Sequence, residues 1–157
     1  MAPDVHPDLD SLAFLLGSWS GEGEGTYPTT TPFRFREQMR FEHVGGAFIL
    51  YAQRSWLAGD GGPIHFESGV VRPGGPGRVE FALAHPLGLT EISEGTVQGT
   101  EIDVASTSVG RSATGDPVTS LVRRYRMRDD ALRYELDMAM DATPLTFHVR
   151  GELRRDP

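Results

Sequence analysis

The chain has 157 residues, 22 carboxylates and 15 arginines, no lysine, no cysteine and a formal net charge of −7. This length suits one domain with a sizeable hydrophobic core. The missing residue types exclude disulfide frameworks, thiolate metal sites, Schiff-base chemistry and the P-loop lysine, and the negative charge disfavours a nucleic-acid partner.

An N-terminal tail and a short helix are predicted over residues 1–16. Pro7 suits a first helical turn, and Leu9, Leu12, Ala13 and Leu16 share one side of the helix. A helix of about two turns is not stable alone, so it should pack on the remaining chain as a lid or plug. Its apolar run is too short for a membrane span and follows no basic region, so we expect a cytoplasmic protein without a membrane partner.

The next segment carries the most informative pattern of the chain. Gly17, Trp19, Gly21 and Gly23 form a Gly-x-Trp-x-Gly-x-Gly series. Glycines on one face of a strand let it bend or let another group approach its backbone. Such a series is typical of the first strand of small ligand-carrying β-barrels, in which the indole fills the closed end. Taken alone, Trp19 is equally consistent with an ordinary core residue.

Alternation with period two dominates the rest of the chain. In residues 33–44 the odd positions begin Phe-Phe and the even positions are mostly charged, which predicts a half-buried strand. Further strands are predicted at 47–57, 64–72, 78–85, 88–94, 101–108, 119–128, 131–140 and 145–154, separated by Gly, Pro and Asp turns. The arginine-rich run 123–126 is interpreted as a solvated strand face. The pattern predicts an all-β fold, a roughly ten-stranded antiparallel up-and-down β-barrel forming one domain over residues 1–157.

His148 is the histidine whose environment decides the chemistry. Strict alternation places it with Thr146 and Arg150, opposite Leu145 and Phe147. If that face meets solvent, His148 is a surface residue. If the face lines an open cavity, or a bulge rotates the residue, its neutral imidazole can ligate a metal. No histidine pair has zinc-site spacing and no serine lies in a nucleophile elbow. The residues by themselves therefore predict a barrel that binds a small molecule.

The motifs, taken in order, resemble the nitrobindins, a family of haem-binding ten-stranded barrels related in shape to fatty-acid-binding proteins. The resemblance extends over nearly the whole chain and is not limited to the glycine–tryptophan series. Its other segments are Tyr27–Thr29, Pro32–Phe33, His43–Gly45, His65-x-Glu67-x-Gly69, Leu83–Pro86, Thr90–Ile92, Gly95–Thr96, Leu132-x-Tyr134 and Pro144–His148.

The resemblance implies a specific site and activity. His148 falls on the proximal axial ligand of haem b, with one haem per chain, and His65 falls on a histidine of the distal side. Thr29 would lie at the haem end of the pocket. Members of the family bind nitric oxide at ferrous haem and isomerise peroxynitrite to nitrate at ferric haem, so these small molecules are the expected partners. The sequence does not specify the oligomeric state and is compatible with a homodimer.

One position departs from the family pattern. Related bacterial sequences carry a lysine where this chain has Asp116. A carboxylate cannot form the charge-assisted contact that an ammonium makes with a haem propionate, so haem would bind more weakly unless Arg111 or another arginine substitutes. Two alternatives follow from the residues alone. One is a haem-free carrier of a fatty acid or other small hydrophobic ligand; the other is an interaction protein with a collapsed interior.

Overall fold

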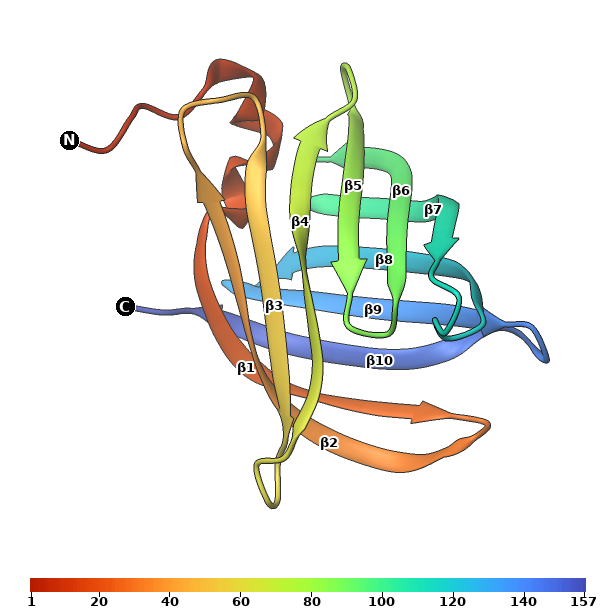
Figure 1. Cartoon of the computed structure of the whole chain (residues 1–157). Helices are drawn as coiled ribbons and strands as arrows, with labels where there is room; N and C mark the ends of the chain where they lie inside the picture. Colours follow the sequence, from red (N-terminus) through yellow and green to blue (C-terminus); the bar gives the residue numbers. More distant parts are fainter.

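The computed structural model describes residues 1–157 as ten antiparallel strands closed into a barrel, preceded by one short helix (Figure 1). Each strand pairs with its neighbours in sequence, and the last strand closes the barrel on the first. The elements are η1 (Pro7–Leu15), β1 (Gly17–Tyr27), β2 (Thr30–His43), β3 (Ile49–Leu57), β4 (Pro63–Pro73), β5 (Arg78–His85), β6 (Leu89–Gln98), β7 (Glu101–Arg111), β8 (Val118–Arg128), β9 (Ala131–Met140) and β10 (Thr143–Arg155). The predicted all-β, ten-stranded up-and-down barrel is confirmed.

The N-terminal helix differs from the prediction in its period. It is a 3-10 helix throughout, and its buried residues are Leu9, Leu12 and Leu15. Leucines spaced by three residues align along one edge only at three residues per turn, so burying all three selects the 3-10 form. The predicted side with Ala13 and Leu16 assumed the α-helical period and was wrong in that respect. The helix packs on β4 and β6, as expected of a plug.

Trp19 joins this plug to the barrel. Its side chain is 1% exposed, and its indole Nε1 donates a hydrogen bond to the Leu15 carbonyl at 2.8 Å. The guanidinium carbon of Arg155 lies 4.2 Å from the centre of the ring. Trp19 therefore fills the closed end of the barrel, as the first-strand pattern predicted.

The glycines of β1 permit close contact with neighbouring strands. A Cβ atom on Gly21 would lie 2.0 Å from the Glu152 carbonyl oxygen, and one on Gly23 would lie 2.3 Å from the Phe35 ring. These are positions that no side chain can occupy, and they explain the alternating glycines in the motif.

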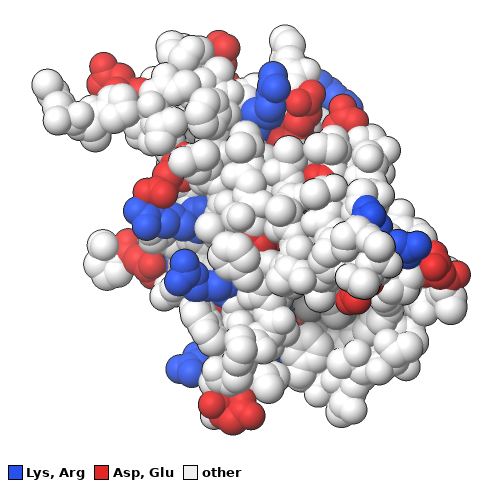
Figure 2. All heavy atoms as spheres, in the orientation of Figure 1, with Lys and Arg blue, Asp and Glu red and all other residues white.

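The outer surface balances its arginines with carboxylates. Arg124 lies 3.0 Å from Asp137, and Arg126 lies 2.7 Å from Asp103. Figure 2 shows basic and acidic side chains next to one another around the face that it draws. None of the structure has the length and apolar character of a membrane-spanning helix.

Candidate functional site

The barrel interior is packed at the helix end and hollow at the other. A cavity of about 290 Å³ lies among apolar side chains near the β1–β2 turn, including Phe33, Leu89 and Met138. His148 lies on one wall of this cavity, and His65 and His85 lie on another. The site thus combines apolar walls with three imidazoles, and the two histidines predicted as functional line the same space.

A β-bulge turns His148 toward the cavity. In the β9–β10 ladder Phe147 lies opposite Asp137, whereas Val149 lies opposite Leu136, so His148 is an extra residue on its strand. A bulge of this kind re-aims side chains, and both His148 and Val149 line the cavity. The structure therefore decides between the alternatives for His148 in favour of an inward-facing, bulged residue.

The hydrogen bonding of His148 leaves one ring nitrogen for a ligand. Nδ1 lies 3.0 Å from the carbonyl oxygen of Thr26. Since a carbonyl only accepts, Nδ1 carries the proton and Nε2 keeps its lone pair. Burial lowers the pKa of His148, partly opposed by the Thr26 carbonyl and reinforced by His65, which favours the neutral ring. Tyr27 and Phe33 pack edge-on against the imidazole, with ring centres 5.2 and 6.4 Å away.

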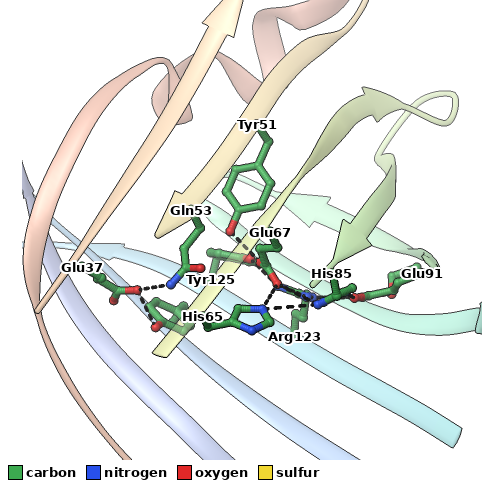
Figure 3. Close-up of polar contacts among 11 residues, drawn as sticks. Glu37, Tyr51, Gln53, His65, Glu67, His85, Glu91, Arg123 and Tyr125 are labelled. Carbon is green, nitrogen blue, oxygen red and sulfur yellow. Dashed lines mark hydrogen bonds and ion pairs between the residues drawn. The ribbon is translucent and has the colours of Figure 1, made fainter. Parts of the chain in front are cut away.

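On the other wall, two histidines form a hydrogen-bonded cluster with two carboxylates (Figure 3). His65 Nε2 lies 3.2 Å from Glu67 Oε2 and 3.3 Å from His85 Nδ1. His85 Nε2 lies 2.9 Å from Glu91 Oε1. The side chain of His65 is 26% exposed and that of His85 only 5%, so the cluster extends from the cavity into the core.

Arg123 holds both carboxylates of this cluster. Its guanidinium contacts the two oxygens of Glu67 at 2.7 and 3.0 Å and the two oxygens of Glu91 at 2.8 and 3.0 Å. Burial alone would raise the pKa of both carboxyls, but the arginine and the histidines outweigh it. The pKa of Glu67 is held well below its usual range and that of Glu91 is lowered to about 2. Both are therefore ionised at neutral pH.

Glu37 lies in a second buried polar group with the opposite behaviour. Tyr134 Oη and Gln53 Nε2 donate to its Oε2 at 2.8 and 3.1 Å, while its Oε1 has no partner. Burial raises the pKa of Glu37 to about 7 against these two hydrogen bonds, with a further rise from the charge of Glu67. Gln53 and Tyr134 line the cavity, so this group forms part of its floor.

The remaining predicted residues lie at or beyond the rim. Thr29 is exposed in the turn between β1 and β2, and its neighbour Thr30 lines the cavity. The Asp116 amide donates to the Leu87 carbonyl at 3.0 Å in the loop before β8. Arg111 lies 3.7 Å from Asp141. The residues of the Gly-x-Trp-x-Gly-x-Gly series lie in the first strand and are absent from the cavity wall.

Sequence reasoning gave no role to Arg123 and misplaced it. The run 123–126 was interpreted as a solvated face, but Arg123 is 4% exposed and faces the interior between Leu121 and Tyr125. The available signal was alternation, since those flanking residues are apolar at the same parity. The charged neighbours Arg124 and Arg126 obscured it. Glu67, His85 and Glu91 lay within recognised motifs, but their mutual contacts depend on strands far apart in sequence.

Comparison with known proteins identifies the family. Residues 8–155 match the family described as THAP4-like, heme-binding beta-barrel domain. The chain belongs to this family, the nitrobindins. Peroxynitrite isomerase 2 of Mycobacterium marinum is 45% identical over 99% of this chain and 99% of its own length. The peroxynitrite isomerase of Nocardia farcinica is 45% identical over 97% of this chain and 93% of its own. The crystal structure of Rv2717c from M. tuberculosis has a TM-score of 0.91 at 42% identity, covering 98% of this chain and 100% of that one.

The residues of this nitrobindin fit a haem group. His148 provides a neutral imidazole whose Nε2 is free while its Nδ1 is fixed by a backbone carbonyl. Metal-ligating histidines characteristically have this arrangement, because the second contact fixes the tautomer and the ring orientation. Apolar side chains such as Phe33, Leu121 and Met138 surround the same cavity, as the faces of a porphyrin require.

Proposed function

We propose that this nitrobindin is a haem-dependent peroxynitrite isomerase that converts peroxynitrite to nitrate. The observation that carries the proposal is the bulged His148, whose protonated Nδ1 is held by Thr26 and whose Nε2 is left for iron. The full-length similarity to proteins named peroxynitrite isomerase supports the choice of reaction. Haem b is the proposed cofactor, with one group per chain.

The protein contributes position, polarity and exclusion of water. His148 would hold the iron through Nε2, and its hydrogen bond to Thr26 would keep the ring at a fixed orientation. When bound, ferric haem supplies a Lewis acid toward an oxygen of peroxynitrite. The apolar cavity walls keep bulk water away from the reacting ligand and retain its fragments close together.

His65 is the proposed ligand-facing residue on the distal side. Its Nε2 is already engaged with Glu67 and His85, so Nδ1 is the ring atom left for a ligand. In this tautomer Nδ1 accepts a hydrogen bond from a protonated ligand, and after a shift of the ring proton it donates one. Thr29, by the family resemblance, would contribute at the haem end of the pocket.

The proposal has several finer parts. Nitric oxide is proposed as a second ligand, the cytoplasm as the location and a homodimer as a compatible assembly. Because the barrel is closed, a dimer would form through side chains on its outer face and not by pairing of free sheet edges. Asp116 offers no cation for a haem propionate, and Arg111 is the proposed substitute in the same loop region.

A hemin titration followed by the Soret band tests the proposal. Wild type should show a saturable one-to-one shift, and His148→Ala should lose it while its far-UV circular dichroism stays that of a folded barrel. His6→Ala, an N-terminal histidine outside the cavity, serves as the matched control and should bind hemin as wild type does. Equal shifts in wild type and His148→Ala would contradict the proposal. Nitrate yield from peroxynitrite, with and without hemin, then tests the reaction itself.

A haem-free carrier of a fatty acid or other hydrophobic ligand is the alternative function. The apolar walls of the 290 Å³ cavity favour it, because they would accept an acyl chain without any metal. An organic extract of the purified protein that contains fatty acid, together with no hemin binding, would select this alternative. The same cavity argues against the third possibility, an interaction protein with a collapsed interior.

A further inference from the structure

We propose that His65, Glu67 and His85 form a binding site for a divalent transition-metal ion of the zinc class, separate from the histidine that would hold haem. The three side chains come from β4 and the end of β5 and converge on one point (Figure 3). The site requires no haem and does not depend on the proposed function.

The spacing of the three donor atoms matches one face of a tetrahedron around zinc. His65 Nε2, His85 Nδ1 and Glu67 Oε2 are separated by 3.2, 3.3 and 3.4 Å. Zinc–nitrogen and zinc–oxygen bonds in proteins require ligand atoms about 3.3 Å apart in a tetrahedral site. An ion placed over this triangle would reach all three atoms without movement of the backbone.

The cluster also contains the outer contacts that metal-binding histidines use. His85 Nε2 donates to Glu91 at 2.9 Å, which leaves the lone pair on Nδ1, the atom that faces the proposed ion. Glu91 is itself held by Ser93 and Arg123. A carboxylate behind a metal-ligating imidazole fixes its tautomer and strengthens its donor atom. His65 needs only to move its proton from Nε2 to Nδ1 to become the second nitrogen ligand.

The charges of the cluster favour an added cation. Two carboxylates, Glu67 and Glu91, share a single guanidinium, Arg123, so the buried group carries one excess negative charge when both imidazoles are neutral. The guanidinium occupies one side of Glu67, and Oε2 of the same carboxylate remains within reach of both histidines. A divalent ion would place its charge where the negative charge is in excess.

The composition of the site identifies the class of ion. Two imidazoles and one carboxylate are a ligand set of zinc sites that keep a fourth position open, and imidazole nitrogen selects zinc or cobalt over magnesium or calcium. His65 and His85 both line the cavity, so water or a small anion from the cavity can complete the coordination.

Titration of the metal-free protein with Co²⁺ tests the site, because tetrahedral cobalt gives an intense visible spectrum. We expect one equivalent per chain and displacement by Zn²⁺. His85→Ala should weaken Co²⁺ binding about 100-fold or more, and Glu91→Gln should weaken it between about 10- and 100-fold. His65→Ala, at a more exposed position, gives a second ligand deletion if His85→Ala does not fold.

His148→Ala is the matched control, because it removes a histidine from the same cavity but leaves the cluster intact. It should bind Co²⁺ as wild type does, while the hemin titration of the same variant reports separately on the haem site. The proposal is overturned by the absence of a tetrahedral cobalt spectrum. It is equally overturned by unchanged affinity in folded His85→Ala and His65→Ala, or by loss of cobalt binding in His148→Ala.

Discussion

The imidazole Nδ1 of His148 lies 3.0 Å from the carbonyl oxygen of Thr26, which links the bulge in β10 to the end of β1 beside it. The acceptor is part of the backbone, so side-chain substitution at position 26 leaves it in place. This contact sets the tautomer of His148 and aims its other nitrogen at the cavity. The proposed ligand geometry is therefore built into the closure of the barrel.

We expect His148→Gly to lose hemin binding and to recover it when free imidazole is added. The substitution vacates the ring position but keeps the Thr26 carbonyl, which can accept a hydrogen bond from the added imidazole. Soret titrations with and without imidazole measure the recovery. His148→Phe is the control, because its ring fills the same space without a donor atom and should not be rescued. Equal recovery in both variants would show that imidazole binds elsewhere.

Arg123→Met should destabilise the fold strongly. It removes the only arginine in contact with Glu67 and Glu91 and leaves two buried carboxylates without a countercharge. Breaking a buried ion network in this way costs about 3–5 kcal/mol. Arg124→Met is the matched control on the same strand, since Arg124 is 39% exposed and pairs with Asp137; it should cost no more than about 1 kcal/mol. Urea denaturation of the three proteins measures the difference, and equal losses would contradict the assigned role.

The fold could be predicted because its signals are local. Alternation over 33–44 and the glycine-rich turns between later segments each depend on neighbouring residues, and together they require an antiparallel meander. The form of the first helix was less accessible. Choosing the 3-10 form depends on burying Leu15 with Leu9 and Leu12, and this burial requires the barrel beneath.

The site was predicted only where a residue type was informative by itself. His148 and His65 were identified from the family resemblance, but the bulge that turns His148 inward arises from pairing with β9 and leaves no mark in the strand's own sequence. Arg123 was missed for a related reason. Its burial is stabilised by carboxylates from β4 and β6, which no local pattern connects to β8.

Gly21→Ala should cost about 3 kcal/mol or more, at the upper end of the usual penalty for overpacking. The added methyl would lie 2.0 Å from the Glu152 carbonyl oxygen, and this backbone atom cannot move without breaking the β1–β10 ladder. Gly59→Ala is the matched control, because a methyl group at that position would have no atom within 4 Å; its effect should stay within about 0.5 kcal/mol. Thermal unfolding of both variants tests the contrast, and a neutral Gly21→Ala would refute the close-approach explanation.

Glu37 should make the protein less stable as the pH rises from about 5 to about 7. Burial raises its pKa from 4.5 to about 7 in the folded state, so over this interval the unfolded chain loses a proton that the folded barrel retains. The folded state is then penalised by up to about 3 kcal/mol, and the penalty stays constant at higher pH. Glu91, with a pKa of about 2, has already made its opposite contribution below this range.

The measurement is the free energy of unfolding of wild type and Glu37→Gln at each pH between 5 and 8. Taking the difference between the two proteins is necessary because the lowered pKa of His148 makes stability rise with pH over part of the same range, equally in both. The variant should gain on wild type steadily up to pH 7 and then run parallel to it. A difference that does not change with pH would mean that Glu37 is ionised throughout, with its unpartnered Oε1 charged inside the barrel.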